Sequence, residues 1–458
     1  MAGVTFLLEQ HLKRPSFSRA FLRESVEAFE AVGPWLLTLL CLGIIGFTVK
    51  IMTGEMPVQF YLMVSYASAL SLVTIAPIHT MMTRFMSDEI FRVNYQGIVE
   101  CLITATICAV GVSFAVAGPI VFMFSGIELN QRLGFIGLTV LLSLFWCISA
   151  GLSALRKERL FLLLFSIGVF LLLIVFHAAR PRQIITLLLL FSGCIAVPVS
   201  GGYAYIIKLY AQEPIRLNWG FLKRKQSLRN GFSVLFFYLG FWIDKLVFWY
   251  SDRSGVCFDR LFRYCPDYDF PFFAAATLMM FGSVLIHRGM KRKVGVAYRS
   301  FSFKLENNFS FREIALEKYR LVDGIGQVSM SVFLFYGGIA FFVLLLITLN
   351  IIALPWQNPF VFHYLLIGTV FYSLFCFYFL LLQYLDECRI LFRVNLSFLL
   401  LNAAISWLSV QVGYQFYGIG FLAASAICAA VSFTIVNAKV GGLEYMIFMK
   451  AVKQSPGA

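Results

Sequence analysis

The sequence predicts an all-α polytopic membrane protein with twelve transmembrane helices, and two observations lead to this class. Of the 458 residues, 60% are hydrophobic and 13% are charged, whereas an average globular domain has about 25% charged residues. The second observation is a series of charge-poor apolar runs, since a membrane helix needs ~20 mostly apolar residues. The composition excludes a soluble multidomain protein, a disordered chain, a collagen and a disulfide-stapled secreted fold.

Ten apolar runs provide the expected spans. Two of them are too long for one helix. The run 325–385 should turn at 350–359, which contains two Pro and two Asn, and the run 394–438 should turn at the Gly-containing stretch 413–420. With these turns the chain has twelve spans. The runs are 31–49, 56–83, 101–127, 133–155, 160–179, 183–207, 231–250, 270–287, 325–385 and 394–438.

The distribution of basic residues predicts the orientation. Twelve spans put both termini on one side, and the segments on that side hold 29 of the 37 Lys and Arg. Seven lie in the opposite loops, and Lys245 lies inside a span. By the positive-inside rule, both termini are expected in the cytoplasm. The same rule explains most of the net charge of +14 without a nucleic-acid partner, although binding of anionic membrane lipids or an acidic partner by the basic loops stays open.

The chain is expected to divide into two helical bundles with short flanking segments. The predicted parts are a cytoplasmic amphipathic segment 1–32, a first six-helix bundle 33–207, a cytoplasmic linker 208–231, a second six-helix bundle 232–440 and a cytoplasmic tail 441–458. Within the first part, residues 16–30 form an amphipathic pattern. Such a helix either lies on the membrane surface or packs on the cytoplasmic ends of other spans.

A weak internal repeat relates the two halves. The block SLFWC at 143–147 precedes the basic turn RKERLF, and the block SLFCF at 373–377 precedes DECRILF. Ser143 and Ser373, like Arg159 and Arg389, are separated by 230 residues. Each block closes the fourth span of its half and opens the fifth. Transporters are commonly built from two such repeats with the substrate path between them.

Several kinds of chemistry have no motif in this chain. The five His lack metal-ligand spacing, and the sequence contains no CxxC, no P-loop and no dinucleotide-binding GxGxxG. We therefore expect no metal, no cofactor and no enzymatic activity. Transport by such a protein would be driven by an ion gradient or by a partner that makes the cargo.

The pair Asp244-Lys245 is the strongest polar signal inside a span. A charge in the middle of a membrane helix costs ~2.5–3.5 kcal/mol, so the pair costs roughly 5–7 kcal/mol. Neighbouring residues point about 100° apart on a helix, so at least one of the two needs a partner elsewhere. An intramembrane ionisable residue is a candidate transport site. The alternative is a structural ion pair with a neighbouring helix.

The first two spans contain further transport candidates. Gly33, Pro34 and Trp35 open the first span, and His79 lies late in the second, close to Pro77. Proline inside a span bends the helix and frees a carbonyl group. A moving first helix is one interpretation, and a static kink is the other. His79 could carry a proton, although a lone His is more often a packing residue.

Two pairs outside the apolar runs are also candidates. Arg84 lies at a cytoplasmic helix end, with Asp88 one turn later. These residues could latch a cytoplasmic gate, or they could form ordinary interfacial ion pairs. Cys257 and Cys265 both lie in the expected periplasmic loop 251–270. They could form a disulfide or remain two thiols.

Four motifs resemble the PelG family, the inner-membrane transporter of the Pel exopolysaccharide system. They occur in the family's order along nearly the whole chain. The residues that match the family inside the last three motifs are Gly33, Pro34, Trp35, Arg84, Asp88, Trp242, Asp244 and Lys245. Trp242 thereby joins the transport candidates. The motifs are MAGVTFLLEQHLKR at 1–14, VGPWLL at 32–37, TRFMSDEIF at 83–91 and FWIDKLVFWYS at 241–251.

The resemblance implies a fold, a cargo and partners. The fold is that of the multidrug/oligosaccharidyl-lipid/polysaccharide flippase superfamily, with two six-helix bundles around a central cavity and alternating access. The implied function is export of an amino-sugar exopolysaccharide across a bacterial inner membrane for the biofilm matrix. The implied partners are the polysaccharide cargo, a cytosolic glycosyltransferase and membrane Pel-type subunits that sense a cyclic dinucleotide.

Other functions remain open at this point. A flippase for a lipid-linked oligosaccharide would need several Arg or Lys inside the bundle to bind a diphosphate, and only Lys245 qualifies. A cation-coupled drug antiporter of the same fold could use Asp244. A membrane enzyme would need a nucleotide-sugar motif, which the sequence lacks.

Overall fold

The computed structural model describes residues 17–222, 225–307, 309–351 and 358–445. Three predictions therefore fall outside the described residues: the motif at 1–14, much of the turn at 350–359 and the tail after residue 445. Of residues 17–31 only the helical backbone is described, so the expected amphipathic face of that segment also lies outside them.

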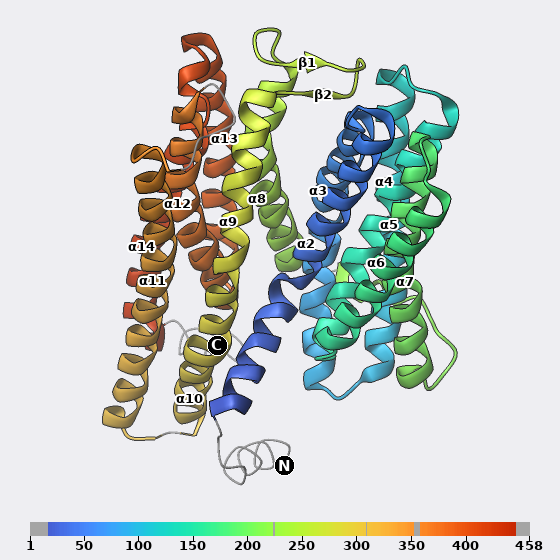
Figure 1. The fold of residues 1–458 in the computed structure, drawn as a ribbon. Coiled ribbons are helices and arrows are strands. Elements are labelled where there is room, and N and C mark those ends of the chain that lie inside the picture. Colours follow the sequence, from blue (N-terminus) through green and yellow to red (C-terminus); the bar gives the residue numbers. More distant parts are fainter. Residues whose placement is uncertain (1–16, 223–224, 308, 352–357, 446–458) are drawn as a thin grey trace.

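Twelve helices in the described residues are long and apolar enough to cross a membrane, which confirms the predicted number. They form two bundles side by side (Figure 1). The first bundle contains α2 (Phe17–Thr53), α3 (Val58–Phe91), α4 (Tyr95–Phe124), α5 (Leu129–Ala154), α6 (Glu158–Ala179) and α7 (Ile184–Tyr210). The second contains α8 (Lys225–Tyr250), α9 (Pro266–Gly289), α11 (Phe311–Thr348), α12 (Pro359–Tyr384), α13 (Cys388–Val412) and α14 (Ile419–Gly441).

Short elements connect these helices. The linker between the bundles contains the 3-10 helix η1 (Trp219–Leu222), and α8 begins inside the predicted linker. The strands β1 (Val256–Cys257) and β2 (Arg263–Tyr264) form an antiparallel hairpin between α8 and α9. Two further elements follow α9, the π-helix η2 (Met290–Val294) and α10 (Gly295–Glu306), and η3 (Tyr414–Phe416) precedes α14.

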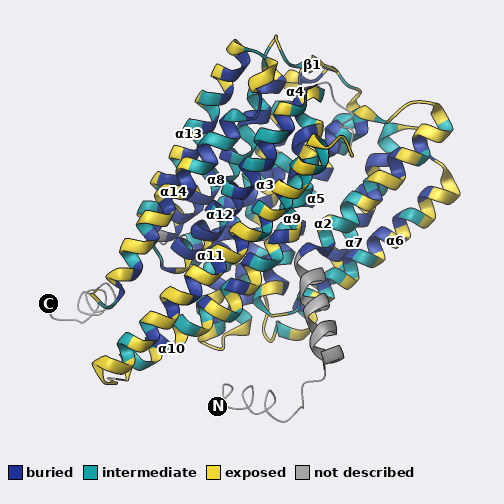
Figure 2. Cartoon of the chain, turned by 60° about the vertical axis from the view of Figure 1, so that its left-hand side comes forward, coloured by how far each residue is buried: buried dark blue, intermediate teal, exposed yellow. Residues whose placement is uncertain are grey.

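The bundles touch along two pairs of helices, α3 with α8 and α2 with α9. At one contact, Gly231 of α8 lies against the backbone of Pro77 in α3, where a Cβ would approach it to 3.1 Å. Buried side chains fill the inside of each bundle, whereas many exposed ones face outward (Figure 2). The outward side chains include large apolar residues such as Phe47 and Phe341, which is expected where the surrounding solvent is lipid.

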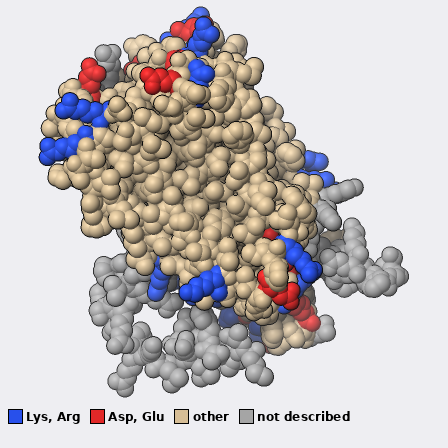
Figure 3. All heavy atoms as spheres, turned by 90° about the vertical axis from the view of Figure 1, so that its right-hand side faces the viewer, with Lys and Arg blue, Asp and Glu red and all other residues tan. Residues whose placement is uncertain are grey.

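Charged residues lie towards the two ends of the molecule. The middle of the face formed by the first bundle shows no Lys, Arg, Asp or Glu in the space-filling view (Figure 3). At one end, Lys318 at the start of α11 pairs with Glu444 after α14 at 2.6 Å, and Lys439 pairs with Glu387 at 3.1 Å. The β-hairpin lies at the opposite end (Figure 1).

The internal repeat extends to the backbone. The helices α5 and α12 begin 230 residues apart, and so do α6 and α13. The turn after α5 places Arg156 in the left-handed region at φ 58°, and the turn after α12 places Asp386 there at φ 63°. Each turn is closed by hydrogen bonds between equivalent residues, from the amide of Lys157 to the carbonyl of Leu152 and from Glu387 to Leu382. The same helix-ending turn thus occurs in both halves.

One expectation from the sequence is wrong. The stretch 288–326 looked like a long cytoplasmic loop, but most of it is helical. The span that begins with α9 continues through η2 and α10 as one helical stretch of 41 residues, and α11 has 38 residues. A capping box at Ser310 and Glu313 starts α11 well before its apolar part, since each side chain satisfies a backbone N–H of the other.

Candidate functional site

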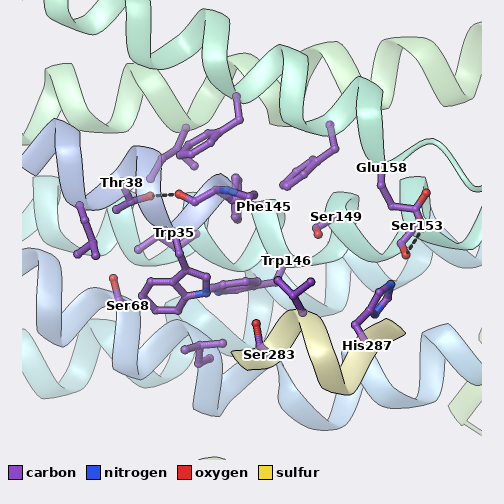
Figure 4. A pocket seen from close by; sticks show the side chains of 18 of the residues that line it. Trp35, Thr38, Ser68, Phe145, Trp146, Ser149, Ser153, Glu158, Ser283 and His287 are labelled. Carbon is purple, nitrogen blue, oxygen red and sulfur yellow. Dashed lines mark hydrogen bonds between the residues drawn. The ribbon is translucent and has the colours of Figure 1, made fainter. Parts of the chain in front are cut away.

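A cavity of about 750 Å³ lies between the two bundles. Its walls come from α2, α3, α5, α6 and α7 of the first bundle and from α8, α9, η2 and α12 of the second. Figure 4 shows its side chains, with Trp35 and Trp146 towards one end of the view and Ser153, Glu158 and His287 towards the other. A largely apolar cavity with a few polar groups at a bundle interface is the usual form of a binding site.

Aromatic side chains form much of the cavity wall. Trp35 of α2 and Trp146 of α5 lie next to each other (Figure 4). The indole N–H of Trp146 donates to the Ser71 hydroxyl at 3.4 Å, and the Phe145 ring packs edge-on against Trp146 with 5.4 Å between the ring centres. Trp242 of α8 closes the cavity from the second bundle. The cavity therefore offers indole faces from both bundles.

Hydroxyl groups supply most of the polar surface inside the cavity. They are spread over α2, α3, α5 and α9, so that a bound molecule would meet donors and acceptors on several sides. Such groups are uncharged and bind sugar hydroxyls as readily as water. They belong to Thr38, Ser65, Ser68, Ser149, Ser153 and Ser283.

The kink residues of the first span lie where they were expected. Pro34 lies inside α2, and the Thr38 hydroxyl donates to its carbonyl at 2.7 Å. Pro34 and Trp35 line the cavity, whereas Gly33 is buried beside them and is not part of the described lining. A proline at this position interrupts the hydrogen bonds of the helix. Whether α2 moves stays a prediction.

The mouth of the cavity is basic and lies at the end of the molecule that carries η2. Arg288, Lys291 and Arg292 line it, together with His287 from the last turn of α9. Glu158, the first residue of α6, is the acidic residue in this lining and accepts from the Ser153 hydroxyl at 3.3 Å. This end corresponds to the predicted cytoplasmic side.

Asp244 and Lys245 do not reach the cavity. Asp244 is fully buried in the second bundle, and Lys245 Nζ lies 3.3 Å from Asp244 Oδ1 and 3.1 Å from the carbonyl oxygen of Phe241. The partner expected on another helix is Tyr268 of α9, whose hydroxyl donates to Asp244 Oδ2. Neither residue belongs to the described cavity lining. The pair therefore supports the second bundle, and a direct role in transport stays an untested prediction.

Aromatic rings surround the Lys245 ammonium group. Nζ lies 3.3 Å from the centre of the Phe272 ring, 4.6 Å from that of Phe241 and 5.0 Å from that of Trp242. These cation–π contacts stabilise a charge that is out of reach of water. They also hold the Trp242 ring, which lines the cavity. The buried pair thus supports the cavity wall from behind.

Arg84 connects the two bundles. Its Nη1 lies 2.6 Å from Asp386 Oδ1, across 302 residues of sequence. Arg84 is in α3, and Asp386 is in the turn between α12 and α13. Asp88 follows Arg84 by one turn of α3. Of the two interpretations made from the sequence, an ion pair between the bundles fits a gate latch.

His79 lies in α3 and is partly buried, two residues after the proline in that helix. It is not among the described residues that line the cavity. The geometry therefore gives it no contact with a molecule bound there, and a role in proton transfer stays a prediction.

The hairpin at the opposite end touches both bundles. The Tyr66 hydroxyl of α3 donates to the carbonyl of Arg263, and the Asp259 carboxylate accepts the Gly126 amide at 2.9 and 3.1 Å. On the other side, Arg253 donates to the carbonyl of Gln411 after α13. The hairpin thus bridges the bundles at the end away from the cavity mouth.

Both cysteines of this loop are thiols in the structure. Cys257 is exposed and Cys265 is buried. The strand register pairs Cys257 with Arg263, so that the ladder does not bring the two sulfur atoms opposite each other. Of the two states left open by the sequence, the structure therefore has the unpaired one. Burial raises the pKa of Cys265 to about 12.

Within the described residues, no group of three or more His, Cys, Asp and Glu could hold a metal ion. Sequence reasoning did not select Trp146, the cavity hydroxyls or Asp386. Trp146 and Asp386 both lie in or beside the repeated blocks at 143–147 and 373–377. An aromatic or acidic residue inside a repeated block, where the two halves differ, was the signal that could have identified them.

Solved structures with this fold are multidrug transporters. "Crystal structure of MATE in the bent conformation" aligns with a TM-score of 0.58 at 13% identity, covering 94% of this chain and 96% of that chain. "Crystal structure of MATE in complex with MaL6" aligns with a TM-score of 0.56 at 12% identity, covering 92% and 97%. A MOP superfamily transporter from Pyrococcus furiosus aligns with a TM-score of 0.55 at 14% identity, covering 93% and 96%. At these identities the likeness shows the fold alone.

A comparison with curated proteins found no match. The family described as "PelG: Putative exopolysaccharide Exporter (EPS-E)" matches residues 1–448. Because this match covers nearly the whole chain, and the fold is that of the transporters just named, the protein belongs to the PelG family of exopolysaccharide exporters.

Proposed function

We propose that this membrane transporter moves a Pel-like amino-sugar exopolysaccharide from the cytoplasm to the periplasm of a bacterium, through the cavity between its bundles. The observation that carries the proposal is the cavity wall, with indole faces from both bundles and hydroxyl groups on several helices. It also rests on the family, since PelG proteins are described as exopolysaccharide exporters. The polymer would contribute to the biofilm matrix.

The wall chemistry suits a sugar chain. One face of a pyranose ring carries C–H groups that pack on an aromatic ring, while its edge carries hydroxyl groups. Trp35, Trp146 and Trp242 offer such rings, and Thr38 and Ser149 offer hydrogen-bonding partners nearby. These interactions are individually weak and unselective along the chain. A polymer can therefore slide over them without being trapped.

The two ends of the bundle interface support transport by alternating access. In this structure the cavity reaches the end predicted to be cytoplasmic, and the hairpin joins the bundles at the other end. Export would require the hairpin contacts to open and the cytoplasmic end to close. The pair Arg84–Asp386, which already joins the bundles beside the mouth, is the contact we assign to the cytoplasmic gate.

The alternatives have less support from the site. A cation-coupled drug antiporter would need an acidic group in the binding cavity, and the acidic residue among the described lining, Glu158, lies at the mouth. For a lipid-linked oligosaccharide flippase, the basic lining groups Arg288, Lys291 and Arg292 are likewise at the mouth, away from the indole rings. Both termini are proposed to be cytoplasmic, and a cytosolic glycosyltransferase and Pel-type membrane subunits are the proposed partners.

Deletion of the gene followed by assay of secreted polysaccharide tests the function. Complementation with Trp146→Ala should reduce the secreted polymer at least about tenfold at normal membrane levels of the protein, because the central stacking surface is lost. Trp407→Ala is the matched control, since this tryptophan is exposed on α13 and lies outside the described cavity lining. Unchanged secretion after the deletion would overturn the proposal.

A further inference from the structure

We propose that the helical arm formed by α10 and the first part of α11 is a docking surface for the soluble enzyme that makes the polymer. The arm comprises residues 295–307 and 309–323. The inference rests on the proposed function, because a transporter without a polymerising motif needs its cargo from a separate enzyme. The docking site itself follows from the length, exposure and charge of the arm.

The arm extends beyond the membrane surface. The charge-free part of α9 ends before Arg288, and Phe303 lies 15 residues further along the helix, or about 22 Å at 1.5 Å per residue. On α11, Phe311 lies 12 residues before Asp323, which corresponds to about 18 Å. The headgroup layer is only about 5–8 Å thick on each side of a bilayer. The tip of the arm therefore stands in water.

Large apolar side chains are nevertheless exposed on this tip. Phe311 is 80% exposed, Tyr319 is 72% exposed and Phe303 is 59% exposed. The Phe303 and Phe309 rings lie together, with 6.1 Å between their centres. On α11, Phe311, Tyr319 and Val322 follow helical spacing and share one side. Exposed aromatic groups of this kind in water mark a protein interaction site.

The arm is internally rigid, so this exposure is a property of its surface. Phe301 is completely buried between α10 and α11. Lys304 of α10 and Arg320 of α11 both lie 2.9 Å from the carboxylate of Glu317, which is buried. Preorganised helices lose little conformational freedom on binding, which favours a specific contact.

Charge and position indicate the kind of partner. Residues 288–323 contain nine Lys and Arg and four Asp and Glu, for a net charge of +5. An acidic surface with an apolar groove would therefore complement the arm. The same helical stretch supplies Lys291 and Arg292 to the cavity mouth. An enzyme bound to the arm would release its polymer next to the entrance.

Site-specific photo-crosslinking in the producing cells tests this surface. A photoreactive phenylalanine at Phe303, Phe311 or Tyr319 of the full-length protein should yield an adduct that mass spectrometry identifies as a glycosyltransferase. Two control positions should not yield this adduct. Phe341 is exposed within the apolar part of α11, and Phe91 is 91% exposed at the end of α3 on the same side of the membrane. Adducts with lipid only, with a second copy of the chain or with no protein would overturn the proposal.

A variant separates this proposal from the export function. The double change Phe311→Ser and Tyr319→Ser should reduce the co-purified enzyme at least about tenfold and lower secretion, whereas Phe91→Ser should leave both unchanged. In contrast, Trp146→Ala should lose secretion and keep the adduct. If deletion of the gene leaves secretion unchanged while the adduct persists, the export function fails and the docking surface stands.

Discussion

Two ion pairs in this protein have opposite environments. Lys245 and Asp244 are adjacent on one helix, with side chains 5% and 0% exposed and 3.3 Å between the charged atoms. Arg84 and Asp386 come from different bundles, with side chains 33% and 30% exposed and 2.6 Å between the charged atoms. The buried pair lies inside one rigid unit, and the partly exposed pair joins two units.

The difference separates stability from movement. Breaking a buried pair leaves an uncompensated charge and costs about 3–5 kcal/mol, whereas an exposed pair contributes about 0–1 kcal/mol. A contact that must open during each transport cycle has to be of the second kind. The intramembrane pair was the strongest signal in the sequence, but the pair suited to gating is the weaker one at the bundle ends.

Substitution of the buried pair should have the largest effect. Asp244→Asn removes the carboxylate that neutralises Lys245 and should destabilise the folded protein by about 3–5 kcal/mol. The expected result is a low membrane level and a lowered Tm in detergent, measured by immunoblot and thermal unfolding. The double variant Asp244→Asn with Lys245→Met should recover much of the level, because no isolated charge remains buried. A normal level of Asp244→Asn combined with lost secretion would instead show a role in transport.

Substitution of the pair between the bundles should have a smaller effect without loss of protein. Arg84→Ala should keep the membrane level and change secretion about two- to fivefold, because up to about 1 kcal/mol of the closed cytoplasmic gate is lost. The exchange Arg84→Asp with Asp386→Arg should restore secretion. Failure of the exchange to improve on either single variant would argue against a direct pair.

The opposite end of the interface should respond to pH only in acid. Burial acts to raise the pKa of Asp259, but hydrogen bonds from the amides of Gly126, Arg260 and Leu261 and from the Ser125 side chain lower it below the usual value overall. A lowered folded-state pKa means that the contact is complete above the unfolded pKa of about 3.9 and is lost as the pH falls through the folded value.

Hydrogen exchange at the Gly126 amide, corrected for the intrinsic rate, measures this contact. Protection should be constant from pH 5 to 8 and should decrease below about pH 4. Asp259→Asn should reduce protection at neutral pH, because an amide accepts fewer hydrogen bonds than a carboxylate. Protection that decreases near pH 6 would point to a different group.

The cysteines of the hairpin should report on this end without affecting transport. A membrane-impermeant maleimide, given access to the periplasm, should label Cys257 because it is exposed, and should leave Cys265 unlabelled because burial raises its pKa to about 12. Cys257→Ser should abolish labelling and keep secretion within about twofold. Labelling that appears only after reduction would demonstrate a disulfide. Labelling from the cytoplasm alone would reverse the proposed orientation.

The class of protein, the number of spans and the internal repeat follow from the sequence. Lipid requires ~20 apolar residues for each crossing, so the spans are visible as local runs. The offset of 230 residues between Ser143 and Ser373 also holds for the turns at Arg156 and Asp386. The motifs that resemble the PelG family agree with the match over residues 1–448. All of these properties depend on residues that are close together or on a regular spacing.

The location of the binding cavity depends on tertiary structure alone. Apolar residues surround every span, so the sequence does not determine how a helix is rotated or which neighbour it touches. Trp35 and Trp242 therefore face the cavity as expected, whereas Asp244 and Lys245 face Tyr268 and Phe272. The contact between Arg84 and Asp386 spans 302 residues. Only the packing of one bundle against the other brings these two side chains together.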